Sequence, residues 1–137
     1  MTATITYLGD LRTQAEHISS GSGLITDAPV DNHGKGQAFS PTDLVVAAHA
    51  SCMLTLMGIA ARTHGIDMDG TRADALKVMA AAPRRIARIE TVIFFPPEKN
   101  YSSKERAILE NAARTCPVAL SLHPDVAQDI SFVWPEP

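Results

Sequence analysis

Two cysteines, Cys52 and Cys116, are the residues whose types most directly suggest chemistry. Cys52 lies within a long uncharged stretch, and Cys116 directly precedes Pro117. A cysteine that is oxidised to a sulfenic acid is rescued when a second thiol condenses with it, so two thiols are enough for a redox cycle. The plain alternative is a pair of inert, buried thiols, because a free cysteine packs like a small hydrophobic side chain. The cysteines alone leave both interpretations open.

His49 offers a different chemistry for Cys52, because it lies one helical turn before that residue. This spacing would suit a Cys–His nucleophile, as in a hydrolase or an acyl transferase. Such a nucleophile normally has an oxyanion hole and a third, orienting group, which a cysteine in the middle of a helix lacks. We therefore expect His49 to be a partly buried, hydrogen-bonded residue.

Metal binding has little support in the sequence. The two cysteines and five histidines show neither a C-x-x-C nor an H-x-x-x-H spacing. Structural zinc sites are built from such closely spaced ligands. We expect no metal site and no cofactor.

A helix beginning near Ser40 must position Cys52. Ser40 and Asp43 match a capping box, and Pro41 suits the first helical position. No residue from position 44 to position 61 is charged, which predicts a helix that is buried on most of its faces. His64-Gly65 marks its expected end, since glycine readily adopts the left-handed conformation there.

The same stretch is long and apolar enough to raise the possibility of a membrane span. Polar residues interrupt its middle, and neither basic nor aromatic residues flank it as they flank a membrane-spanning helix. We therefore expect a buried helix and no membrane partner.

The remaining residues predict strands and two shorter helices. The expected strands are 3–8, 11–18, 24–26, 71–80, 85–95 and 129–134, and the expected helices are 102–115 and a short one from Pro117. Without regular βαβ alternation, this order predicts an α+β fold with antiparallel sheets in a single domain, 1–137. One small sheet cannot cover the central helix, so a second sheet or a second subunit must, and we predict a homodimer.

The composition limits which binding partners and which cellular compartment we expect for the protein. The chain has 137 residues, and its formal net charge of −3 gives no basic field for nucleic acid. The first residues show neither a basic start nor an apolar run, so no secretory signal is expected. This places the protein in the cytoplasm, where cysteines are more often reduced or redox-active than structural disulfides.

Three motifs together resemble the OsmC/Ohr family of peroxide-detoxifying proteins. They are Ser-Pro-Thr-Asp-Leu-Val-Val-Ala-Ala-His-Ala-Ser-Cys at 40–52, Pro-Arg-Arg-Ile at 83–86 and Cys-Pro-Val at 116–118. The resemblance extends along nearly the whole chain. It implies an OsmC-like fold, an intertwined homodimer with two long central helices per subunit, flanked by sheets, and active sites near the subunit interface.

The resemblance also implies an activity. The protein would be a thiol peroxidase that reduces small organic hydroperoxides, with Cys52 as the peroxidatic and Cys116 as the resolving cysteine. Their disulfide would then be reduced by an external dithiol. Apolar residues that share the Cys52 face of an ideal helix favour alkyl peroxides, because burying one CH₂ group contributes about 0.8 kcal/mol.

In this family an arginine from the N-terminal region keeps the peroxidatic thiol ionised, and an acidic residue at the start of the central helix holds the arginine. Arg12 is the candidate for the arginine. The organic-hydroperoxide branch has a glutamate ten residues before the cysteine, where this chain has Thr42. Asp43 is adjacent, but it lies opposite Cys52 on an ideal helix, which favours a capping role. The other candidates to hold the arginine are Asp27, Asp31 and Glu16.

The missing glutamate keeps a second hypothesis open. A protein could retain the OsmC-like fold without catalysis and bind an apolar or acyl small molecule in the same pocket.

Overall fold

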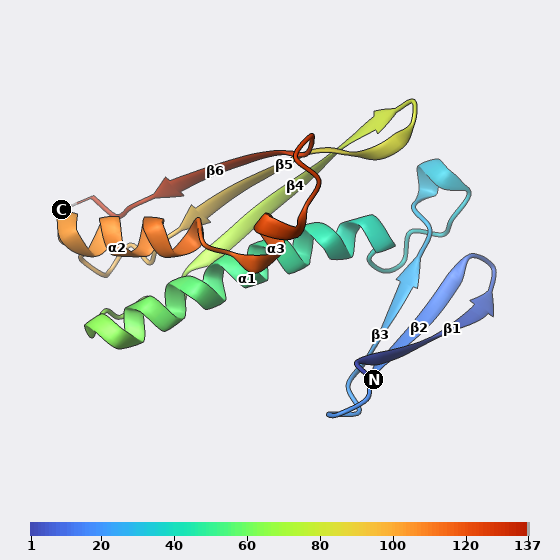
Figure 1. Ribbon diagram of the computed structural model, residues 1–137, viewed down its shortest axis with the longest axis horizontal. Coiled ribbons are helices and arrows are strands. Elements are labelled where there is room, and N and C mark those ends of the chain that lie inside the picture. The colour runs from blue at the N-terminus through green and yellow to red at the C-terminus, as the bar shows by residue number, and fades with distance from the viewer. Residues whose placement is uncertain (137) are drawn as a thin grey trace. The chain divides into compact units, whose positions relative to one another are not determined.

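The computed structural model describes residues 1–136 (Figure 1), and the chain divides into two compact units, Met1–Val45 and the part that begins at Val46. The elements are β1 (Ala3–Gly9), β2 (Arg12–His17), β3 (Gly23–Asp27), a 3₁₀ turn (Val30–Asn32), α1 (Pro41–His64), β4 (Arg72–Ala81), β5 (Arg84–Phe94), α2 (Ser103–Ala113), α3 (Pro117–Ser121) and β6 (Ala127–Val133). The predicted α+β fold is confirmed. That residues 1–137 form a single domain stays a prediction.

The first unit contains an antiparallel sheet with the strand order β1-β2-β3. Its register aligns Ile5 with Ala15 and Ala15 with Leu24, so these side chains share one face of the sheet. Ile5 and Tyr7 are 61 % and 64 % exposed, and Leu24 is exposed as well. The sheet therefore has an apolar face that remains open to solvent in a single chain.

Helix α1 begins as predicted. The Asp43 backbone N–H donates to Ser40 Oγ at 3.1 Å, and the Ser40 backbone N–H donates to Asp43 Oδ2 at 2.9 Å. These two reciprocal bonds form the capping box. The helix ends at His64, and Gly65 follows with a φ of 66°. Glycine tolerates this left-handed conformation because it has no Cβ.

Only one stripe of α1 is buried in a single chain, which differs from the expected burial on most faces. The buried residues recur at helical spacing and are Val46, His49, Ala50, Met53, Met57 and Ala61. Helix α1 is long and apolar enough to cross a membrane by length and composition alone, and 33 % of its most apolar window is buried. The uncovered apolar surface is what a second subunit would have to bury.

The second unit contains a sheet with the strand order β4-β5-β6. Strands β4 and β5 pair antiparallel, whereas β5 and β6 pair parallel. The expectation of purely antiparallel sheets is therefore wrong for β6. The physical reason is the connection: α2 and α3 lie between β5 and β6 and return the chain to the end of the sheet where β5 began.

Helices α1 and α2 lie along one face of this second sheet (Figure 1), and the main core fills the space between them. Met53 and Met57 of α1 pack in one buried cluster with Ile93 of β5 and Leu109 of α2. Helix α2 has 11 residues and is shorter than the second long helix implied by the resemblance. A capping box formed by Ser102 and Glu105 begins this helix.

Candidate active site

The structure brings Cys52 and Cys116 together. Cys52 lies in the middle of α1, and Cys116 is the residue that caps the N-terminus of α3. The two thiols are free, and Cys52 packs against the buried cluster that contains Cys116, close enough to raise the pKa of the Cys116 thiol. Cys116 is completely buried, whereas Cys52 is only partly buried. Two residues far apart in the sequence thus form an asymmetric pair with one accessible sulfur.

The surroundings of Cys116 favour its protonated form. Burial raises the pKa of this thiol above its ordinary value, and the neighbouring Cys52 thiol raises it further. The Ala119 N–H donates to Cys116 Sγ at 3.4 Å and acts in the opposite direction. This N–H group at the start of α3 favours the thiolate, but burial of the sulfur outweighs it. Cys116 is a thiol that retains its proton.

We expect iodoacetamide to alkylate Cys52 well before Cys116 in the reduced, folded protein. Cys116 is 0 % exposed, and its raised pKa leaves less of the reactive thiolate. Peptide mapping after timed alkylation measures the two rates separately, and unfolding in urea should make them similar. Equal labelling in the folded protein would contradict the asymmetry.

His49 does not form a catalytic pair with Cys52. It is completely buried, and its Nε2 lies 2.9 Å from Oε1 of Gln128. Within the described residues its other ring nitrogen, Nδ1, is buried without a hydrogen-bond partner. The Cys–His hypothesis is therefore wrong, because neither nitrogen bonds the Cys52 sulfur. The expectation of a hydrogen-bonded histidine is confirmed, and the burial is more complete than expected.

Gln128 is a site residue that the sequence analysis missed. On β6 it alternates with Ile130 and Phe132, whose side chains are also partly buried, between exposed neighbours. A polar residue at an inward position of a strand is unusual and normally has a buried partner. The alternation of inward and outward residues along this strand could have identified Gln128, but the expected strand begins at residue 129 and leaves Gln128 out.

Arg12 lies in the first unit and is held by Asp27 and Gln37. Its Nε donates to Asp27 Oδ1 at 2.7 Å and its Nη2 to Asp27 Oδ2 at 2.9 Å, while Nη2 also donates to Gln37 Oε1 at 2.8 Å. This bidentate arrangement fixes the guanidinium plane. Of the carboxylates left open by the sequence, Asp27 is the one that binds Arg12, whereas Asp43 closes the capping box of α1.

The ion pair shifts both groups toward their charged forms. The hydrogen bond from Arg12 lowers the pKa of Asp27, and burial of that carboxylate opposes the shift. The pKa of Arg12 is raised, mainly by its hydrogen bond to Asp27. Since the pKa of Asp27 is lower in the folded protein than in the unfolded chain, the pair adds stability at neutral pH. This contribution is lost as the pH falls through the folded-state value.

We expect the variant Asp27→Asn to be less stable than the wild type at pH 7, and the difference to shrink below a pH of about 4. The wild type loses its ionised carboxylate in that range, whereas the variant has none to lose. Urea unfolding followed by circular dichroism at several pH values measures the difference. A gap that stays constant from pH 7 to pH 3 would contradict the assignment.

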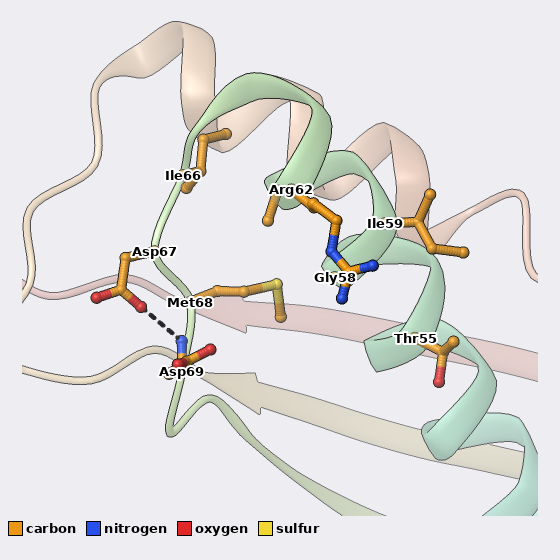
Figure 2. A pocket seen from close by; sticks show the side chains of 9 residues that line it. Thr55, Gly58, Ile59, Arg62, Ile66, Asp67, Met68 and Asp69 are labelled. Carbon is orange, nitrogen blue, oxygen red and sulfur yellow. Dashed lines mark hydrogen bonds between the residues drawn. The ribbon is translucent and has the colours of Figure 1, made fainter.

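A separate hollow of about 520 Å³ lies at the C-terminal end of α1 and in the segment that follows (Figure 2). Its lining includes Ile59, Arg62 and Met68, and neither cysteine contributes to it. The hydrogen bond drawn there joins the Asp69 backbone N–H to Asp67 Oδ1.

A family model described as OsmC-like protein matches residues 34–131, a range that includes both cysteines and Gln128. The chain belongs to the OsmC-like protein family. A solved structure of a predicted osmotic stress induced and detoxification response protein from Psychrobacter arcticus is 51 % identical to this OsmC-like protein. Its TM-score is 0.92, and the match covers 97 % of this chain and 96 % of that one.

More distant structures share the fold of this OsmC-like protein. An organic hydroperoxide resistance protein OsmC from Legionella pneumophila is 17 % identical, with a TM-score of 0.71 and 96 % of each chain covered. A predicted organic hydroperoxide resistance protein from Vibrio cholerae, with captopril bound in one of its active sites, is 14 % identical. Its TM-score is 0.73, with 96 % of this chain and 91 % of that one covered. A comparison with curated proteins finds no match.

Proposed function

We propose that this OsmC-like protein is a thiol-dependent peroxidase that reduces organic hydroperoxides to alcohols. The observation that carries the proposal is the packing of a partly accessible thiol, Cys52, against the buried cluster that contains a fully buried thiol, Cys116. A peroxide can reach only an accessible sulfur, and a resolving thiol must lie within bonding reach of it. In this proposal the accessible Cys52 is the peroxidatic residue and the neighbouring, buried Cys116 is the resolving residue.

The proposed cycle has three steps. The Cys52 thiolate attacks the terminal oxygen of the hydroperoxide, the O–O bond breaks, and the alcohol leaves after taking up a proton. Cys52 is then a sulfenic acid. The Cys116 thiol condenses with it, which forms the disulfide and releases water. An external dithiol supplies two electrons and two protons and restores both thiols.

Arg12 is the proposed cation that keeps Cys52 ionised. This role comes from the resemblance to the family, and the firm hold of Asp27 and Gln37 on the guanidinium supports it. A positioned arginine suits the task because it remains charged at any physiological pH. In this proposal Asp27 takes the part that a glutamate plays in the organic-hydroperoxide branch.

The proposed substrates carry an alkyl group. Leu56 and Ile59 follow Cys52 by one and two turns on the same side of α1, and both retain exposed surface. Contact with these side chains would favour an alkyl hydroperoxide over hydrogen peroxide, since each CH₂ group removed from water contributes about 0.8 kcal/mol.

We also propose that the protein acts as a homodimer. The open apolar face of the first sheet, with Ile5 and Tyr7, and the incompletely buried helix α1 support this assembly. A three-stranded sheet with such a face is unlike the surface of a stable monomer. Sedimentation should show a species of twice 14.7 kDa at micromolar concentration, and a compact monomer would contradict the proposal.

The alternative of a non-catalytic binding protein rested on the absent glutamate at position 42. Asp27 now accounts for the missing carboxylate, because it binds the guanidinium of Arg12 in a bidentate manner. No observation in the described residues specifically favours the binding protein.

One experiment tests the proposed peroxidase. The reduced protein is treated with one equivalent of cumene hydroperoxide and analysed by intact mass and by peptide mapping. We expect the loss of two hydrogen atoms and a peptide pair that is bridged by Cys52 and Cys116, together with one equivalent of the cumyl alcohol. Unreacted thiols after this treatment would reject the peroxidase and leave the binding protein.

A further inference from the structure

A closed circuit of hydrogen bonds surrounds the buried thiol Cys116. The thiol donates to the carbonyl oxygen of His49, with 3.8 Å between sulfur and oxygen, and Sγ accepts from the Ala119 N–H at 3.4 Å. The Ala119 carbonyl accepts from Nε2 of Gln128 at 3.1 Å, and Gln128 Oε1 lies 2.9 Å from Nε2 of His49. The circuit returns to its starting point at His49. It joins α1, α3 and β6 around one sulfur.

The direction of each bond in the circuit is fixed by its neighbour. The Ala119 carbonyl can only accept, so the amide of Gln128 must direct its NH₂ group there. Its carbonyl oxygen therefore faces the imidazole, and His49 Nε2 must carry the proton and donate. If the Gln128 amide were flipped, its oxygen would face the Ala119 carbonyl oxygen, and two acceptors cannot form a hydrogen bond. The side chains of His49 and Gln128 are thus a donor and a matching acceptor.

Burying two polar side chains costs free energy of desolvation, which indicates that His49 and Gln128 have a role besides packing. His49 is completely buried, and its Nδ1 has no hydrogen-bond partner in the described part of the chain. An unsatisfied buried polar atom is destabilising, and an apolar side chain would avoid that cost. What the imidazole contributes is an anchor for Gln128, which in turn holds the first turn of α3 through Ala119.

We propose that His49 and Gln128 are positioning residues for the resolving step, holding the Cys116 thiol in line with the sulfur of Cys52. The inference rests on the proposed peroxidase function and adds to it the residues that set the speed of disulfide closure. In that step the Cys116 sulfur displaces hydroxide from the Cys52 sulfenic acid, its proton leaves with the hydroxide as water, and the S–S bond forms. Such a displacement is sensitive to small misplacements of the attacking atom.

The circuit acts on Cys116 and not on the encounter of Cys52 with peroxide. Its removal should therefore slow the second step and spare the first. We expect His49→Leu and Gln128→Leu to close the disulfide at least about tenfold more slowly, with sulfenic acid formation within about twofold of the wild type. The sulfenic acid should accumulate and be trapped by dimedone. Rapid quenching with dimedone and an alkylating agent, followed by intact mass, measures both rates in one sample.

Conservative variants separate positioning from folding. His49→Gln places an amide N–H near the position of Nε2 and should restore most of the closure rate, whereas the shorter His49→Asn should not reach Gln128. Both variants are polar and of similar size, so they test the circuit even where leucine prevents folding. Thr91→Val is the matched control, because it removes a buried hydroxyl that has no hydrogen-bond partner within residues 1–136. Its closure rate should equal that of the wild type.

A second measurement makes the inference independent of peroxide. Oxidised glutathione converts Cys52 to a mixed disulfide, and attack by Cys116 then closes the protein disulfide and releases glutathione. Closure from this species should be slowed in the same variants. If the wild type does not react with cumene hydroperoxide but the variants still close the disulfide more slowly from the mixed disulfide, the peroxidase is rejected and the positioning role is kept. Equal closure rates in wild type, His49→Asn and Gln128→Leu, or equal slowing of both steps, would overturn the inference.

Discussion

Replacing Cys52 with serine is expected to lower the rate of organic hydroperoxide reduction by a factor of about 10⁴ or more. A serine hydroxyl is scarcely ionised at neutral pH and is a far weaker nucleophile than a thiolate, and loss of a covalent nucleophile typically has an effect of this size. Consumption of cumene hydroperoxide in the presence of a dithiol measures the rate.

Two further variants make this result specific. Ser51→Ala changes the exposed neighbour of Cys52 and should retain full activity. Cys116→Ser should still react once with hydroperoxide, but it should stop at the Cys52 sulfenic acid and oxidise further with excess peroxide. If Cys52→Ser kept its activity while Cys116→Ser lost the first reaction, the two roles would have to be exchanged.

Replacing Arg12 with alanine is expected to slow the reaction of Cys52 with hydroperoxide by about thirtyfold, which is the gain that ionising an ordinary thiol at neutral pH provides. Lysine should recover only part of the rate, because it cannot make the two parallel bonds that Asp27 makes with the guanidinium. The rate of alkylation at Cys52 by iodoacetamide is the direct measurement. In Arg12→Ala this rate should be lower at neutral pH.

Arg72→Ala is the matched control for this variant. Arg72 also pairs with an aspartate, Asp74, but on the exposed surface of β4. Its replacement should leave alkylation at Cys52 unchanged. Should Arg12→Ala also leave alkylation unchanged, the task of ionising Cys52 would belong to another cation.

Local patterns in the sequence predict the bounds of helix α1 and identify Cys52 and Cys116 as the candidate reactive thiols. The capping box of Ser40 and Asp43 defines the start of α1, and Gly65 defines its end. Cys116 before Pro117 indicated a helix start, and the structure places the sulfur against the Ala119 N–H. Each of these features depends on residues within a few positions of one another, which is why a single sequence reveals them.

The features that the sequence could not provide depend on register between distant strands. Asp27 could be chosen to hold Arg12 only once β2 and β3 were known to align these two residues directly. The parallel direction of β6 follows from the path of α2 and α3 and not from the composition of the strand. Gln128 acquires its role only when β6 brings it to His49.

If the proposed cycle operates, complete burial of Cys116 would make one half of it slower than the other. An incoming dithiol can attack only the Cys52 side of the bridge, so the departing sulfur is Cys116, whose burial raises its pKa. A thiol with a high pKa is a poor leaving group in exchange reactions. Reduction of the disulfide rather than reaction with peroxide would then limit turnover, and under sustained oxidant the protein would spend most of its time in the disulfide form.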